Sequence, residues 1–197
     1  MSEPTPQEWG DRYATGLTPW DVGGPHPELV ARLREGRLPE SGKALVPGCG
    51  RGHDAAALAG AGWHVIAVDF APELDDIVPQ RLSPFGGEFL NADALSLVLE
   101  QPVDLIFDHT FFCAIHPARR PEHGAMVRRL LRSGGTLAAI VMPRGEPIDG
   151  PPWGMKPIHV IEAVGPGFEV VADEPVSHSV PRRGSQEGWL ELRRQDR

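Results

Sequence analysis

The feature that most constrains the fold is a glycine loop between an apolar run and an alanine-rich stretch, in the sequence ALVPGCGRGHDAAALAGAGWHVIAVDF. The loop holds Gly48, Gly50 and Gly52. Without side chains at these positions a ligand can approach the backbone, and positive φ angles carry little strain. A helix is expected over Asp54–Ala61 and a strand over His64–Phe70. This order predicts a βαβ unit with a ligand site at the glycine loop.

Strand-like runs and helical patterns alternate along most of the chain. The strand-like runs are Ala44–Cys49, His64–Phe70, Glu88–Leu90, Asp104–Phe112, Thr136–Met142, Phe168–Val176 and Trp189–Leu192. The helical patterns are Glu28–Arg37, Asp54–Ala61 and Arg120–Arg132. The alternation predicts an α/β fold with a mainly parallel, seven-stranded sheet covered by helices on both faces. The last two runs have no helix between them, so we expect them to form an antiparallel hairpin at the sheet edge.

Length and charge limit the organisation and the partners of the chain. The 197 residues are 41% hydrophobic, which suits one domain, with an N-terminal arm at 1–43 and a core at 44–197. The formal net charge of -8 argues against binding to nucleic acid or to an anionic membrane. We expect a monomer that acts on a small molecule.

Cysteine usage and hydropathy indicate the compartment. Cys49 and Cys113 lie in apolar runs without the paired spacing of a zinc site or a disulfide framework, so no metal site is predicted. The first residues are polar and acidic and contain no apolar signal region. No apolar run reaches the roughly 20 residues that a membrane helix needs. These features together predict a cytoplasmic protein.

The spacing of the loop distinguishes between cofactors. Nicotinamide-binding folds use G-x-G-x-x-G, with a pyrophosphate at the helix N-terminus. Here the spacing is G-x-G-x-G, followed by His53 and Asp54. The Asp54 carboxylate would repel a pyrophosphate, and it is also placed to cap the helix. The observed spacing is the usual motif of Rossmann-like methyltransferases that depend on S-adenosyl-L-methionine.

Two acidic residues follow the next two strands and fit the same cofactor. Asp69 ends the second strand about 20 residues after the loop, where an acidic side chain accepts hydrogen bonds from ribose hydroxyls. The third strand leads into NADAL, where Asp93, followed by Ala94, is placed for the adenine amino group. The predicted cofactor-binding residues therefore include Asp69, Asp93 and Ala94, with the backbone of Gly48 and Gly50.

Several motifs together resemble a known family. ALVPGCGRGHD has Val46 where many methyltransferases carry an acidic residue, and it stands between YATGLTPWDVGGPHP and FDHTFFCAIHPARRPE. GPPWGMKP and HSVPRRG follow in the expected order. The chain from Trp9 to about Trp189 resembles the thiopurine methyltransferase family, and within it the thiol and halide methyltransferase branch. The resemblance implies a class I methyltransferase fold, S-adenosyl-L-methionine as cofactor and a small sulfur acceptor, with thiopurines or halides as further candidates.

The resemblance also implies a role for the aromatic residues of the arm. Trp9 and Tyr13 are four residues apart and share a face if that stretch is helical, and Trp20 follows in TPWD. The family implies that this arm folds over cofactor and substrate and excludes water. Aromatic rings suit such a lid because they bury large areas and can contact a sulfonium through the ring face.

The fourth strand run leads to the expected reaction centre. Asp108 and His109 leave its carboxyl end, next to the methyl-bearing sulfur in this architecture, so Asp108 is counted as cofactor-binding. His109 either binds or deprotonates a thiol or is structural. Halide-active relatives tend to have tyrosine there and in GPPY, whereas this chain has His109 and Trp153. These two are the predicted catalytic residues, and the pattern favours thiols over halides.

Two alternative functions remain open at the level of sequence. One is a nicotinamide-dependent oxidoreductase, against which the loop spacing and the C-terminal hairpin count. The other is a protein that binds the cofactor but is catalytically weak. Its cue is the short crossover APELDDIVPQRLSPFGGEF, where Pro79 and Pro84 are expected to end a helix near Ile77–Val78. The identity of the acceptor does not follow from the sequence.

Overall fold

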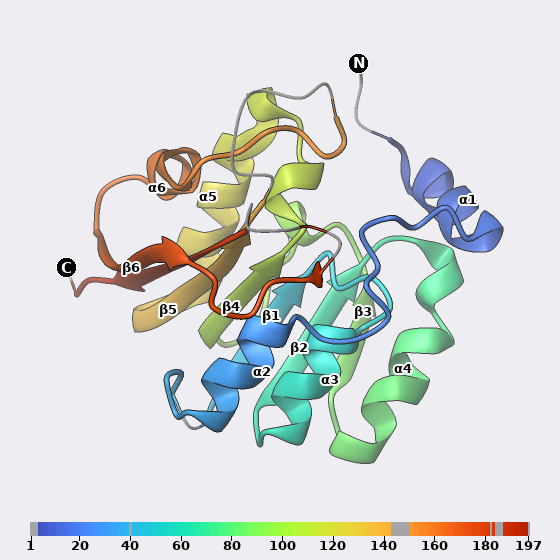
Figure 1. The fold of residues 1–197 in the computed structure, drawn as a ribbon, viewed down its shortest axis with the longest axis horizontal. Helices are drawn as coiled ribbons and strands as arrows, with labels where there is room; N and C mark the ends of the chain where they lie inside the picture. Colours follow the sequence, from blue (N-terminus) through green and yellow to red (C-terminus); the bar gives the residue numbers. More distant parts are fainter. Residues whose placement is uncertain (1–3, 40, 143–149, 182, 184–186, 197) are drawn as a thin grey trace.

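The computed structural model describes residues 4–39, 41–142, 150–181, 183 and 187–196. In this part of the chain, seven strands form one sheet in the order β3-β2-β1-β4-β5-β7-β6 (Figure 1). The strands are β1 Lys43–Pro47, β2 His64–Asp69, β3 Glu88–Asn91, β4 Val103–His109, β5 Leu131–Val141, β6 Phe168–Pro175 and β7 Gly188–Arg194. Pairing is parallel from β3 through to β5. β7 pairs antiparallel with both β5 and β6, so the predicted C-terminal hairpin is confirmed and β6 is the edge strand.

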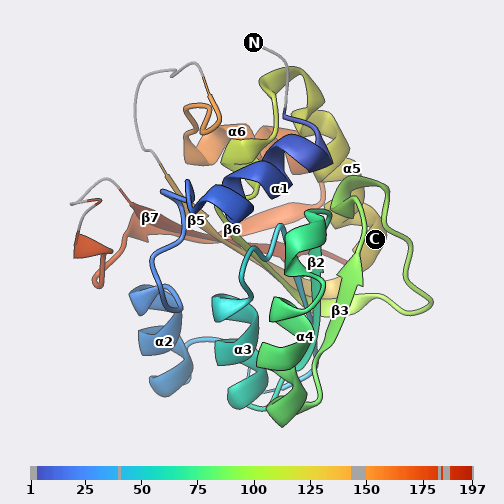
Figure 2. The ribbon, with the colours of Figure 1, turned by 90° about the vertical axis from the view of Figure 1, so that its right-hand side faces the viewer.

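The helices form a layer on each face of the sheet. They are α1 Pro6–Thr15, α2 Pro27–Arg34, α3 His53–Gly60, α4 Ile77–Leu82, α5 Arg120–Leu130 and α6 Pro157–Val164. Leu29 of α2 and Leu58 of α3 belong to one buried cluster with Phe107 of β4. Met126 of α5 and Val160 of α6 belong to a second cluster on the other face. Figure 2 shows the two layers, with α2, α3 and α4 on one side and α5 and α6 on the other. The predicted two-sided coverage is confirmed.

The arm begins with a helix whose N-terminus is encoded locally. Thr5 and Glu8 form a capping box, with Pro6 in the first turn and Gly16 in the left-handed conformation at the C-cap. α1 packs beside the short 3-10 turn that follows β2, so closely that a Cβ at Gly10 would lie 2.2 Å from the Glu73 carboxylate. The arm therefore lies at the carboxyl end of the parallel strands, where ligands of such sheets bind.

Several of the predicted boundaries are wrong. The strand expected from Thr136 begins at Leu131, so residues 131–132, which were expected to end the preceding helix, belong to β5. The helix expected to end near Ile77–Val78 in fact begins there and runs to Leu82. Pro79 lies in its first turn, where backbone N–H groups have no partner within the helix, so proline is tolerated. The strand expected to continue to Phe112 ends at His109, because the next residue, Thr110, has φ +68 and leaves the extended conformation.

Within the described ranges, every helix is too short or too polar to cross a bilayer.

Candidate active site

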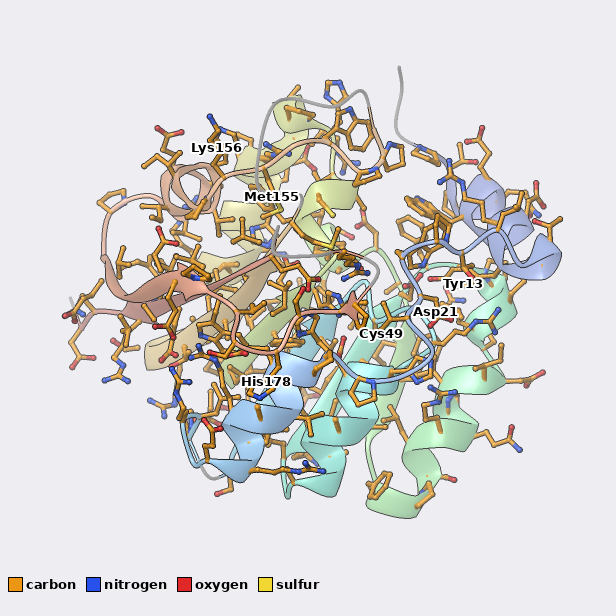
Figure 3. The ribbon with its side chains drawn as sticks, in the orientation of Figure 1. Tyr13, Asp21, Cys49, Met155, Lys156 and His178 are labelled. Atoms are coloured by element: carbon orange, nitrogen blue, oxygen red, sulfur yellow. The ribbon has the colours of Figure 1, made fainter. Side chains whose placement is uncertain are left out.

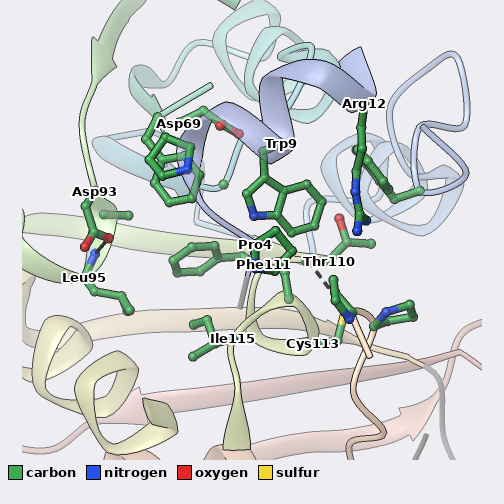
Figure 4. A pocket seen from close by; sticks show the side chains of 18 of the residues that line it. Pro4, Trp9, Arg12, Asp69, Asp93, Leu95, Thr110, Phe111, Cys113 and Ile115 are labelled. Carbon is green, nitrogen blue, oxygen red and sulfur yellow. Dashed lines mark hydrogen bonds between the residues drawn. The ribbon is translucent and has the colours of Figure 1, made fainter. Parts of the chain in front are cut away.

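A cavity of about 500 Å³ lies between α1, the glycine loop and the carboxyl ends of the strands (Figure 4). We call it the main cavity. Its size falls within the range of small-molecule sites. Its walls come from segments far apart in the chain, including residues 4–20 of the arm, the ends of β2, β3 and β4 with the residues that follow them, and Arg183. Asp69 and Asp93 lie on one side of Trp9, and Arg12 lies on the other.

The glycine loop closes one wall of the main cavity with backbone only. Gly48, Gly50 and Gly52 have φ angles of 57°, 52° and 75°, a region that side chains disfavour. A Cβ at Gly48 would lie 2.5 Å from the Phe111 ring, and one at Gly50 would lie 3.1 Å from the Tyr13 hydroxyl. The absence of side chains at Gly48 and Gly50 therefore lets Phe111 and Tyr13 lie close to the loop, and the approach of a ligand to this backbone stays a prediction.

Asp69 joins the end of β2 to this loop. Its carboxylate accepts hydrogen bonds from the N–H of Gly50 at 2.9 Å and of Ala71 at 3.1 Å. Burial raises the pKa of Asp69 despite these bonds. Asp93 begins a 3-10 turn after β3 and accepts from the N–H of Leu95 at 3.0 Å. Asp69, Asp93 and Ala94 all line the main cavity.

The arm brings its three aromatic residues together over the main cavity. The Trp20 ring meets the Trp9 and Tyr13 rings edge to face, with centroids 5.1 and 5.7 Å apart. Trp20 Nε1 donates to Tyr13 Oη at 3.3 Å. The Arg12 guanidinium lies 4.8 Å from the Trp9 ring centroid. Burial, and then the nearby Asp69 carboxylate, raise the pKa of Tyr13, so its hydroxyl stays protonated.

An ion pair and a histidine contact attach the arm to the glycine loop and the start of α3. Asp21 lies 3.0 Å from Arg51 Nε and 3.4 Å from His53 Nε2. Figure 3 shows Tyr13 and Asp21 of the arm near Cys49 of the glycine loop. The arm thus contacts the loop through charged as well as aromatic side chains.

His109 lies between two charged partners rather than in the main cavity. Its Nδ1 is 2.7 Å from Asp54 Oδ2, and its Nε2 is 2.8 Å from Arg183 Nη1. Because a guanidinium can only donate, the Nε2 atom of His109 accepts a hydrogen bond from Arg183. Its Nδ1 therefore carries the hydrogen and donates to the Asp54 carboxylate. His109 lines a smaller hollow of about 40 Å³ beside the glycine loop. Both ring nitrogens are therefore already engaged.

Asp54 is not a helix cap, contrary to expectation. Gly52 is the N-cap of α3, and no side chain caps this helix. Besides contacting His109, Asp54 accepts from the backbone N–H of His26 in the arm at 2.7 Å. Burial acts to raise the pKa of Asp54, but the contacts with His109 and His26 bring it below the ordinary value.

Arg183 and Glu187 join the C-terminal hairpin to the arm. Arg183 lines the main cavity and donates to the Trp20 carbonyl at 2.7 Å and to Glu187 at 3.0 Å. Glu187 also contacts His26 Nε2 at 3.2 Å and accepts from Ser179 and Val180. Burial would raise the pKa of Glu187, but these partners hold it well below its ordinary value. The PRRG motif marked this region without revealing the network, and residues 182 and 184 of that motif lie outside the described part.

Asp108 and Trp153 do not line either hollow among the described residues. Asp108 is 2% exposed and accepts from the N–H groups of Phe111 and Phe112 and from His123 Nε2. Trp153 is 6% exposed, and its ring packs edge to face on His116. The structure therefore does not bring Asp108 to the main cavity, and it does not bring Trp153 together with His109.

Neither of the two cysteines is an activated nucleophile. Cys113 lines it, but burial and then the Asp108 carboxylate raise the pKa of this thiol to about 12. Burial likewise raises the pKa of Cys49. In the described part of the chain, no cluster of three or more His, Cys, Asp or Glu side chains is arranged to hold a metal ion. The site therefore offers binding and orientation.

Comparisons with known proteins agree with this geometry. The family model of thiopurine S-methyltransferase matches residues 4–77, and a methyltransferase domain model matches residues 44–135. A probable thiol methyltransferase 2 of Arabidopsis thaliana is 34% identical over 192 residues, 94% of this chain and 84% of the relative. Thiocyanate methyltransferase 1 of the same plant is 32% identical, covering 91% and 81% of the two chains.

A solved structure shares the fold. The 1,6-didemethyltoxoflavin-N1-methyltransferase of Burkholderia thailandensis superposes with a TM-score of 0.73 at 21% identity, covering 100% of this chain and 93% of its own. The similarity to methyltransferases thus extends over most of the chain. It includes the glycine loop, the acidic residues at the ends of β2 and β3, and the arm. The chain belongs to the thiopurine S-methyltransferase family and is a methyltransferase that depends on S-adenosyl-L-methionine.

Proposed function

We propose that the chain transfers a methyl group to a small sulfur nucleophile, such as a thiol, hydrosulfide or thiocyanate, inside the main cavity. The observation that carries this proposal is the division of charge around the cavity. Asp69 and Asp93 lie on one side of Trp9 and Arg12 on the other. Arg183 joins the cationic side, because it contacts the Trp20 carbonyl while Arg12 faces the Trp20 ring.

The anionic side fits the adenosine part of S-adenosyl-L-methionine. An ionised carboxylate can accept about four hydrogen bonds, and Asp69 accepts two backbone N–H groups. The N–H of Phe70 also bonds to this carboxylate, so Asp69 retains acceptor capacity for a ribose hydroxyl, and Asp93 has capacity for an adenine amino group. Gly48 lines the cavity with its backbone alone, and a Cβ at this position would collide with Phe111. The rings of Trp9, Tyr13 and Trp20 offer faces and edges to a sulfonium.

The cationic side fits an anionic acceptor. The bound cofactor supplies a methyl group activated on a sulfonium sulfur. A lone pair of the acceptor sulfur forms the new S–CH₃ bond as the old C–S bond breaks, and that electron pair stays on the donor sulfur as a neutral thioether. An anionic acceptor has no proton to lose, so the chain needs no base. Arg12 and Arg183 attract the anion, and the arm aromatics exclude water and limit its orientations.

The same reasoning extends to the organisation and location of the chain. Residues 1–43 act as a lid on the core at 44–197, because Trp9, Tyr13 and Trp20 close the main cavity. We propose that the chain acts as a monomer on a small molecule. The net charge of -8 supports a function without nucleic acid. Two free cysteines support a cytoplasmic location. A nicotinamide-dependent oxidoreductase is not proposed, because the family is one of methyltransferases.

An acceptor screen tests the proposed function. The protein is incubated with methyl-labelled S-adenosyl-L-methionine and thiocyanate, hydrosulfide, thiophenol, a thiopurine or iodide. We expect the sulfur anions to be methylated faster than iodide. The Arg12→Met variant keeps the length of the side chain, and we expect it to lose turnover of anions while binding the cofactor normally. Methylation of oxygen or nitrogen acceptors in place of all the sulfur acceptors would contradict the proposal.

A further inference from the structure

Thr110 has an unusual backbone conformation at the edge of the main cavity. Its φ of +68° makes it the one non-glycine residue with positive φ in the described part of the chain. This region is unfavourable for a β-branched side chain. Such a conformation persists only where the surrounding structure determines it, and it tends to occur at functional sites. Thr110 follows β4 directly and lines both the main cavity and the smaller hollow.

A buried pair of side chains fixes the turn that contains Thr110. Asp108 accepts from the N–H of Phe111 at 3.2 Å and of Phe112 at 3.1 Å, so its carboxylate spans the turn. His123 of α5 is fully buried, and its Nε2 lies 2.9 Å from the other Asp108 oxygen. The turn is thereby anchored to the helix layer on the far side of the sheet from α3.

The turn also meets the glycine loop and presents a free hydroxyl. Phe111 lies so close to Gly48 that no Cβ fits between them, so the turn packs directly against the loop backbone. The Thr110 carbonyl accepts a weak bond from the Cys113 thiol at 3.4 Å. No hydrogen bond among the described residues uses the Thr110 hydroxyl. In Figure 4, Thr110 lies toward Arg12 and Cys113, away from Asp69 and Asp93.

We propose that Thr110 binds the methyl acceptor through its hydroxyl, and that Asp108 and His123 are positioning residues that hold it in place. The hydroxyl donates a hydrogen bond to the acceptor anion and fixes the line along which its sulfur approaches the methyl group. The left-handed backbone conformation directs the Thr110 side chain toward the main cavity, whereas an extended conformation would direct it elsewhere. The inference rests on the proposed function, because it requires a small acceptor on the cationic side of the main cavity.

Two variants of Thr110 separate binding from packing. Thr110→Val keeps the branched shape and removes the hydroxyl, whereas Thr110→Ser keeps the hydroxyl. With thiocyanate as acceptor, we expect Thr110→Val to raise KM or lower kcat/KM about tenfold or more, the usual effect of losing a hydrogen bond to a charged group. The dissociation constant of S-adenosyl-L-methionine should change less than about twofold, since the lost bond does not involve it. Thr110→Ser should recover most of the activity.

The positioning pair is tested with the same two measurements. His123→Gln keeps an N–H donor toward Asp108 and should retain kcat/KM for thiocyanate better than His123→Leu. Cofactor binding reports whether each variant is folded. If His123→Leu is not folded, Asp108→Asn replaces it, because it keeps the shape of the side chain and one acceptor oxygen. We expect the thiocyanate KM to rise in Asp108→Asn while cofactor affinity is maintained.

The outcomes also separate this inference from the proposed function. If the wild-type protein methylates thiocyanate and Thr110→Val does so equally well, the inference is overturned but the proposed function is not. Equal losses in Thr110→Val and Thr110→Ser also overturn it, because the hydroxyl would then play no part. A wild-type protein that methylates no sulfur acceptor refutes the proposed function, and the role of Thr110 with it.

Discussion

Replacing Glu187 by glutamine should destabilise the protein more than any change at an exposed ion pair. The Glu187 side chain is fully buried and has four polar partners, namely His26, Ser179, the N–H of Val180 and Arg183. Glutamine keeps the shape but removes the charge, and it turns one acceptor oxygen into a donor that faces other donors. Arg183 would then be left without a carboxylate among its described partners.

The expected loss follows from the burial of this group. Breaking a buried pair by removing one charge costs about 3–5 kcal/mol, because the other charge stays uncompensated. The amide oxygen still accepts some of the four bonds, so we expect the lower end, about 3 kcal/mol. A typical domain has about 5–15 kcal/mol of unfolding free energy, so the change should be large in urea denaturation.

Glu174→Gln provides the matched control. Glu174 contacts two arginines, Arg32 and Arg37, whereas Glu187 contacts one, but the Glu174 side chain is 45% exposed. Exposed pairs contribute about 0–1 kcal/mol. The reasoning fails if the two variants lose similar unfolding free energy, or if Glu187→Gln loses less than about 1 kcal/mol.

The pH dependence gives a second readout of Glu187. Its folded-state pKa is depressed from the ordinary 4.5, so the ionised form stabilises the fold. That stabilisation is complete above pH 4.5 and declines as pH falls toward the depressed pKa. The difference in unfolding free energy between wild type and Glu187→Gln should therefore be constant near neutrality and shrink in acid. A difference that grows below pH 4.5 would contradict this sign.

Three further changes test other parts of the site. Gly48→Ala places a Cβ 2.5 Å from the Phe111 ring, so calorimetry should show at least about tenfold weaker cofactor binding. The control is Gly36→Ala, which also has a positive φ (+64) but open space around it, and this variant should bind the cofactor normally. A chain starting at Gly23 lacks the three arm aromatics and should fold, as judged by circular dichroism, yet show almost no methyl transfer; full activity would exclude a lid. Cys113, with its pKa raised to about 12, should resist iodoacetamide at pH 8 in the native protein and react after unfolding, as followed by mass spectrometry.

The sheet and the glycine loop were predictable because their signals are local. Buried strands appear as short apolar runs, and the spacing of Gly48, Gly50 and Gly52 fixes where the backbone must turn. The convergence of Trp9 and Tyr13 followed from helical spacing. Thr5, Pro6 and Glu8 also carry the N-terminal signature of α1, so that helix could have been predicted firmly.

The polar network of the site was not predictable because its members are distant in sequence. His26 and Glu187 are 161 residues apart, and no local pattern says which side chain of a hairpin loop will meet the arm. Asp108 illustrates a subtler limit. Successive side chains on a strand point to opposite faces, so Asp108 meets His123 of α5 while His109 meets Asp54 of α3. The sequence places both at the strand end but does not say which face holds the ligand.

His109 now has two testable roles, and acceptors of different kinds separate them. A base would matter only for neutral thiols, which must lose a proton, and not for thiocyanate, which has none. Because His109 Nε2 already accepts from Arg183, we expect it to hold that guanidinium at the main cavity instead. His109→Asn keeps a donor for Asp54 and loses the contact with Arg183, so kcat/KM should fall by a similar factor for thiocyanate and for 2-mercaptoethanol, an alkyl thiol that is mostly neutral near pH 7. His109→Gln, whose oxygen can reach toward Arg183, should lose less with both. A loss confined to 2-mercaptoethanol would restore His109 as the base and refute the anchoring role.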